Sequence, residues 1–177
     1  YYCSTADLTT KITNSGTISV GTFTYVIGSN SNPTIPALSY GGNLRITCNG
    51  AATCAASLGS GTLTVGGNLT VTASTVGYTA TLDVSVNNNS INVGGNWDTG
   101  TRAVFTPGTS TVTFTATTTG KTITSGSQSF NNLVFNGTGG GWTLQDDTTV
   151  NGDLTITDGT LAAGATNITV DGDWTAS

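Results

Sequence analysis

The sequence predicts an all-β chain wound into a β-solenoid, a stack of coils resembling a parallel β-helix. Apolar and polar residues alternate along most of it, as in Leu82, Val84 and Val86, which is the pattern of strands with one buried face. Thr (39 residues) and Gly (25) form more than a third of the chain, whereas Glu is absent, so strong helix formers are few. A short turn also recurs between apolar stretches. Together these observations predict strands and turns with almost no helix.

The recurring turn joins a small residue, an Asn or Asp, and a large apolar residue. Counted from the residue before each Asn or Asp, it lies at 42, 67, 95, 131 (a degenerate copy), 152 and 172, so the steps are 25, 28, 36, 21 and 20. Gly can adopt the positive φ of a tight corner, and the Asn or Asp can bond a backbone N–H or stack into a ladder. The turn residues are Gly42, Asn43, Gly67, Asn68, Gly95, Asn96, Gly152, Asp153, Gly172 and Asp173.

The strand elements divide the chain into two regions. Residues 1–38 lack the repeated turn and are predicted to form an atypical N-terminal cap, or an arm that contacts another subunit. Residues 39–177 are predicted to form the repeat-containing solenoid domain. Strands are expected at 17–20, 22–27, 44–47, 61–65, 69–72, 80–86, 91–93, 102–105, 111–117, 121–124, 133–135, 142–144, 153–157, 160–161 and 167–170.

An antiparallel β-sandwich is the alternative architecture. In a sandwich the Gly-Gly and Asn-Gly pairs would be hairpin turns instead of solenoid corners. The short strands, and the two turn copies 20 residues apart near the C-terminus, favour the solenoid.

Charge restricts the class of partner. The net charge is −5, and the four basic residues are scattered at Lys11, Arg45, Arg102 and Lys121. Binding to nucleic acid or to an anionic membrane surface needs clustered Lys and Arg side chains. Neither partner is therefore expected. No apolar run approaches the roughly 20 residues of a membrane-spanning helix.

The cysteines suggest an oxidising compartment. Cys48 and Cys54 flank a short loop of small residues, which predicts a disulfide between them, with two buried thiols as the alternative. Cys3 is then left over, and three alternatives are open for it. It could form a bridge to another subunit, pair within the chain in place of Cys48 or Cys54, or stay free. Localisation is therefore predicted to be secreted or at the cell surface.

Three segments resemble a known class of repeat. Residues 61–72 (GTLTVGGNLTVT), 136–159 (NGTGGGWTLQDDTTVNGDLTITDG) and 167–174 (NITVDGDW) are similar to the β-solenoid repeats of large secreted bacterial surface proteins, including adhesin-like and filament-forming ones. The resemblance covers residues 39–177, and its motifs encode turn and core chemistry, not an active site. It implies export and a role as a shaft, stalk, fibre or adhesin.

Catalytic chemistry is poorly supported. Without His, no Ser-His-Asp or Cys-His arrangement can form, and the Gly-rich stretch at 137–141 lacks the Gly-Lys-Ser/Thr of a phosphate-binding loop, so we read it as a flexible corner and expect no enzyme. Calcium is the one cofactor that the sequence suggests, because carboxylates are hard oxygen ligands. The alternative is that these Asp residues are ordinary turn residues. The candidate ligands are Asp146, Asp147, Asp171 and Asp173.

Sequons and tryptophans offer two further candidate sites. Asn88 and Asn136 are the glycosylation candidates because they fall in expected loops, whereas the sequons at Asn68 and Asn167 lie beside expected strands. Trp97 and Trp174 occupy the repeat position of core leucines and are predicted to be core. For Trp142, in a Gly-rich neighbourhood, both core burial and carbohydrate stacking stay open.

These observations favour an extracellular structural protein, a subunit of a self-assembling cell-surface filament or fibre shaft. Its expected partner is a second copy, in a head-to-tail homopolymer, because the repeat that introduces Trp174 looks uncapped. The alternative is an adhesin-type module of a longer secreted protein that binds carbohydrate or another surface component.

Overall fold

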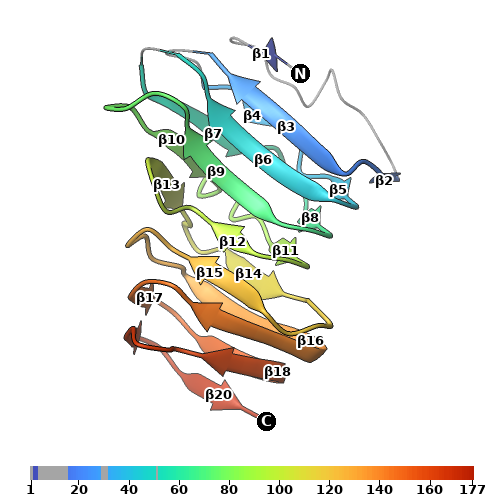
Figure 1. Ribbon diagram of the computed structural model, residues 1–177, viewed down its shortest axis with the longest axis vertical. Coiled ribbons are helices and arrows are strands. Elements are labelled where there is room, and N and C mark those ends of the chain that lie inside the picture. The colour runs from blue at the N-terminus through green and yellow to red at the C-terminus, as the bar shows by residue number, and fades with distance from the viewer. Residues whose placement is uncertain (1, 4–15, 29–31, 51) are drawn as a thin grey trace.

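The chain forms a stack of β-strand coils, with no helix among the residues described. The structure is a computed structural model that describes residues 2–3, 16–28, 32–50 and 52–177. About 7 coils stack from the N-terminal end at the top of Figure 1 to the C-terminal end at the bottom. All strand pairs in the described residues are parallel, so the predicted solenoid is confirmed and the antiparallel sandwich is wrong.

Each coil contributes strands to three faces. Face 1 stacks β2 (Thr17–Ile18), β5 (Ser39–Tyr40), β8 (Leu63–Val65), β11 (Ile91–Val93) and β14 (Thr111–Phe114). Face 2 stacks β1 (Tyr2–Cys3), β3 (Thr22–Ile27), β6 (Asn43–Cys48), β9 (Leu69–Ala73), β12 (Trp97–Asp98) and β15 (Lys121–Thr124). Face 3 stacks β4 (Thr34–Ile35), β7 (Cys54–Leu58), β10 (Ala80–Asp83) and β13 (Ala103–Thr106).

In the lower coils two long strands run across the corner between faces 1 and 2. They are β16 (Asn132–Leu144) and β18 (Leu154–Ala162). Their first halves continue face 1, followed by β20 (Trp174–Ala176), and their second halves continue face 2. On the remaining side, β17 (Thr148–Val150) pairs with β19 (Ile168–Val170).

The region predicted as a cap or arm contains a complete first coil. Strands β2, β3 and β4 pair in register with β5, β6 and β7 of the second coil. Strand β1 pairs with β3 as the outermost strand of face 2. The remaining residues of this region, at 1, 4–15 and 29–31, lie outside the described residues.

Several strands differ from the sequence-based expectation for local reasons. The two strands expected at 133–135 and 142–144 are one, so the intervening Gly-rich stretch is part of β16 and not a flexible corner. Its glycines are needed for space, because a β-carbon at Gly140 would lie 2.5 Å from the Trp142 ring. Strand β7 was missed because its sequence, CAASL, is poor in the β-branched residues that mark strands.

Two ladders of side chains hold the corners in register. At the corner between faces 1 and 2, the amide N–H of Asn68 donates to Asn43 Oδ1, and that of Asn96 donates to Asn68 Oδ1, each at 2.8 Å. Thr122 N–H continues this ladder by donating to Asn96 Oδ1 at 3.0 Å. The Asn side chains therefore satisfy backbone donors of the next coil.

The second ladder lies at the other end of face 1, where β17 leads into β18. Asp153 N–H donates to Asn132 Oδ1 at 3.0 Å, and Asp173 N–H donates to Asp153 Oδ1 at 2.9 Å. The repeated turn thus occupies one corner in the upper coils and a different corner in the lower coils. Residues that are bonded to each other within a ladder are only 20 to 28 residues apart in the sequence. The longer step of 36, between the turn copies at 95 and 131, arises because the turn moves from one corner to the other there.

The glycines of the turn serve close packing, not positive φ. None of the five turn glycines has a φ in the left-handed region, so that expectation was wrong. A β-carbon at Gly67 would collide with Asn43 Oδ1, and one at Gly152 would collide with Asn132 Oδ1. Gly is required because the ladder side chain of the preceding coil lies against it.

Candidate functional site at the open end of the solenoid

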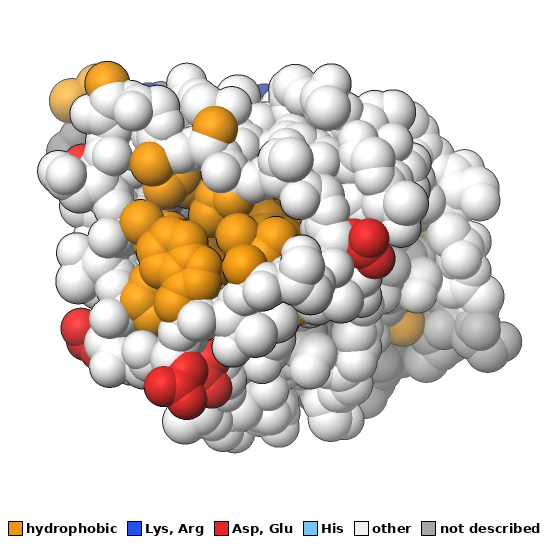
Figure 2. Space-filling model, turned by 90° about the horizontal axis from the view of Figure 1, so that it is seen from below, with side chains coloured by type: hydrophobic (Ala, Val, Ile, Leu, Met, Phe, Trp, Pro, Cys, Tyr) orange, Lys and Arg blue, Asp and Glu red, His pale blue; other side chains and the backbone are white. Residues whose placement is uncertain are grey.

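The last coil has an apolar interior that nothing in the structure covers. Leu161 and Val170 are partly exposed, whereas their register partners one coil above, Trp142 and Val150, are at most 1% exposed. Trp174 is 52% exposed although it continues a buried leucine column. Seen from below, Figure 2 shows hydrophobic side chains gathered in the middle of this end. We call this surface the open end, made of Ile156, Leu161, Ala163, Ile168, Val170 and Trp174.

The open end also presents strand edges. Strands β20 and β19 and the second half of β18 each pair with the coil above, and no described strand pairs with them below. Parallel edges with unpaired N–H and C=O groups are templates for a further strand. Apolar contact and backbone pairing are therefore both available at the same surface.

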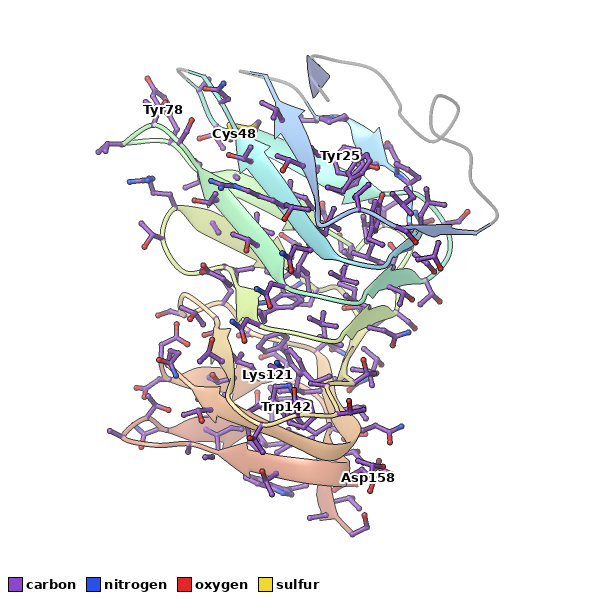
Figure 3. The ribbon with its side chains drawn as sticks, turned by 45° about the vertical axis from the view of Figure 1, so that its right-hand side comes forward. Tyr25, Cys48, Tyr78, Lys121, Trp142 and Asp158 are labelled. Carbon is purple, nitrogen blue, oxygen red and sulfur yellow. A yellow bond between two sulfur atoms is a disulfide. The ribbon has the colours of Figure 1, made fainter. Side chains whose placement is uncertain are left out.

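Acidic residues surround the open end. Residues 122–177 contain six Asp and no basic residue, and Figure 2 shows acidic side chains around the margin of the apolar patch. Asp158 points outward from the lower coils in Figure 3. By contrast, residues 16–38 of the first coil contain no charged residue at all.

The opposite end is closed over its core. Tyr25, Ile27 and Ile35 of the first coil are each 1% exposed. The hydroxyls of Tyr25 and Tyr40 are 2.6 Å apart, and Tyr40 also donates to the Pro36 carbonyl at 3.3 Å. Burial raises the pKa of both phenols above the usual range, and for Tyr25 the hydrogen bond with Tyr40 adds to the increase. The two ends of the molecule are thus chemically different.

The four Asp residues proposed as calcium ligands are not gathered into one site. Asp146 accepts hydrogen bonds from Ser125 N–H at 2.8 Å, from Ser125 Oγ at 3.0 Å and from Gly126 N–H at 2.5 Å. Asp147 accepts from Asn167 N–H at 2.8 Å. Within the described part of the chain, no group of three or more His, Cys, Asp or Glu residues could hold a metal ion. The carboxylates of Asp146 and Asp147 instead accept hydrogen bonds from backbone groups of neighbouring coils.

The disulfide between Cys48 and Cys54 is present. The Cα atoms are 5.9 Å apart, and the bond joins the end of β6 to the start of β7 at the corner between faces 2 and 3. Figure 3 places Cys48 near the top of the stack. Cys3 is therefore not needed for this bridge. Its backbone is the register partner of Ile27, in the outermost strand at the N-terminal end.

The two candidate sequons are exposed, whereas two of the three tryptophans are buried. Asn136 is exposed, although it lies in β16 and not in a loop, and Asn88 is exposed with a φ of 49° and accepts Thr109 N–H at 2.7 Å. Trp97 is buried, as predicted, and so is Trp142, which packs against Phe135 with ring centroids 5.2 Å apart. Neither indole is a carbohydrate platform. Trp174 was also predicted to be core, and that prediction was wrong: it is exposed, and no described strand pairs with β20 on its outer side.

Comparisons with known proteins add no relative. No protein-family model matches the chain, and neither a curated protein nor a solved structure matches it significantly. The described residues also contain no helix with the length and apolarity needed to cross a bilayer.

Proposed function

We propose that the chain is an extracellular structural protein, a subunit of a self-assembling cell-surface filament or fibre shaft. The observation that carries the proposal is the open end, where an apolar patch coincides with unpaired strand edges. The disulfide supports an oxidising, extracellular location, because such bonds persist outside the cytosol. The stacked coils support a shaft role, since each coil contacts only its neighbours and the stack can be lengthened by adding more.

The open end favours a second copy as the partner for a physical reason. An exposed apolar patch bordered by polar residues is a typical interaction surface, and a solenoid coil is the shape that continues a solenoid. When the surface on one copy differs from the surface that it meets on the next, the contact repeats and produces a filament. The two ends of this molecule do differ in charge and in exposure.

Electron microscopy of the concentrated, purified chain tests this function. We expect regular filaments for the wild type and dispersed particles for Trp174→Asp, which places a charge in the open end. Val76→Asp is the matched control, because Val76 is 80% exposed but lies in the loop between β9 and β10. If wild-type particles stay dispersed at every concentration, the proposal is wrong.

Cysteine chemistry provides a second arm of the same experiment. Filaments that disappear with reductant, and also in Cys3→Ser, would assign a bridge between subunits to Cys3. Filaments that persist would show that stacking alone is sufficient. Monomers that bind a glycan array would instead favour an adhesin-type module.

A further inference from the structure

We infer that copies join head to tail, with the open end of one copy seated on the N-terminal end of the next and β20 of the first copy beside β2 of the second. The inference rests on the proposed function and specifies its junction. On face 1, β2 is the outermost described strand at the N-terminal end, and β20 is the outermost strand at the open end. The register places Thr17 of β2 and Thr175 of β20 in the same column of the stack, and both strands belong to one parallel sheet, so β2 of the next copy can pair with β20 and keep the strand direction.

The end coils have matching sizes. In the first coil the corner residues Thr22 and Asn43 are 21 residues apart, and in the last complete coil Asp153 and Asp173 are 20 apart. The middle coils are longer, with laddered partners up to 28 residues apart. Because coil length sets the cross-section, the two ends of the molecule fit each other better than either fits the middle of the stack.

Charge opposes the other arrangement, in which two open ends face each other. Residues 1–121 contain four Lys or Arg and three Asp, a net charge of +1. Residues 122–177 contain six Asp and no Lys or Arg, a net charge of −6, which gives the total of −5. A contact between two open ends would bring two acidic margins together, and like charges across an interface disfavour the pairing. A head-to-tail contact sets the acidic margin against a first coil without charges.

Two variants, each blocked at one end, test this polarity. The first is Trp174→Asp, which blocks the open end. The second is Ser19→Asp/Val20→Asp, which adds negative charge at two exposed residues of the first coil, opposite the acidic margin. Replacing a docked Trp by Asp removes apolar burial from the junction, so we expect assembly to need at least about tenfold more protein. Circular dichroism and the melting temperature confirm that each variant is folded.

Mixing the variants gives the decisive result, read by light scattering after gel filtration. If the junction is head to tail, each variant alone stays monomeric where the wild type polymerises, and an equal mixture gives dimers but nothing longer. If the Ser19→Asp/Val20→Asp variant dimerises alone, the junction joins two open ends and the inference is overturned. A mixture that stays monomeric beside a polymerising wild type also overturns it. Absence of wild-type assembly would instead refute the proposed function.

Discussion

A double-mutant cycle on Gly152 and Asn132 tests why the repeated turn needs glycine. A β-carbon at Gly152 would collide with Asn132 Oδ1, while its next neighbour, the Asn131 carbonyl, is 3.1 Å away. Asn132 cannot move freely, because its Oδ1 accepts Asp153 N–H. Gly152→Ala should therefore break that hydrogen bond and strain the turn, at about 1–2 kcal/mol of unfolding free energy.

The second substitution should remove this effect. Asn132→Ala alone loses the hydrogen bond, at about 1 kcal/mol. In that background Gly152→Ala meets no side-chain oxygen, and it restricts the unfolded chain, so it should be neutral or stabilise by about 0.5 kcal/mol. The coupling energy is then about 1–2 kcal/mol. Guanidinium unfolding followed by tryptophan fluorescence and circular dichroism measures all four proteins.

An equivalent pair in the upper ladder provides the contrast. A β-carbon at Gly95 would lie 2.6 Å from the carbonyl carbon of Gly67 as well as against Asn68 Oδ1. Removing the side chain with Asn68→Ala leaves the backbone collision, so Gly95→Ala should still cost at least about 2 kcal/mol. An additive cycle at Gly152, or equal rescue at both sites, would refute the explanation based on ladder packing.

Three further perturbations have outcomes that the structure fixes. Replacing Cys48 and Cys54 together by Ser should lower the unfolding free energy by about 2 kcal/mol, the entropy of a short closed loop, with reductant then having no further effect in guanidinium titrations. Asp146→Ala should cost about 2–3 kcal/mol, because three hydrogen bonds to a carboxylate are lost, and Asp146→Asn should recover part of that in the same titration. For Tyr25 and Tyr40, whose pKa values are raised by folding, stability is complete below pH about 10 and falls above it by about 1.4 kcal/mol per pH unit for each phenol, since only the unfolded chain releases those protons. Ultraviolet titration should then show these two tyrosinates appearing only with unfolding, and early ionisation would contradict their burial.

The fold was predictable because its determinants are local. Alternation in segments such as Leu63–Val65 decides which face of a strand is buried, and it needs no knowledge of distant residues. The Asn of each turn was also predictable as a ladder residue, since an exposed corner offers it backbone donors and other turn side chains. The disulfide was predictable for the same reason, because its two cysteines are only six residues apart in the sequence.

The change of corner could not be predicted from the turn motif alone. Val93-Gly94-Gly95-Asn96 and Val150-Asn151-Gly152-Asp153 are locally alike, yet the first leads into face 2 and the second into face 1. Which corner a turn occupies depends on β16, whose thirteen residues cover two faces without a turn. That strand needs Gly140 and Gly159 to make room for Trp142, and Gly159 belongs to the next coil. Local pattern carries no information about such a contact.

The acidity of the open end is not required by the ladder that contains it. The ladder needs one oxygen to accept the N–H of the next coil, and Asn68 provides it in the upper coils as Asp153 does in the lower ones. The two side chains are equivalent as acceptors, but only Asp adds a charge. Stability of the corner therefore leaves the choice between them open. The concentration of Asp beside the open end is consistent with the junction proposed above, where two acidic margins would disfavour contact between identical ends.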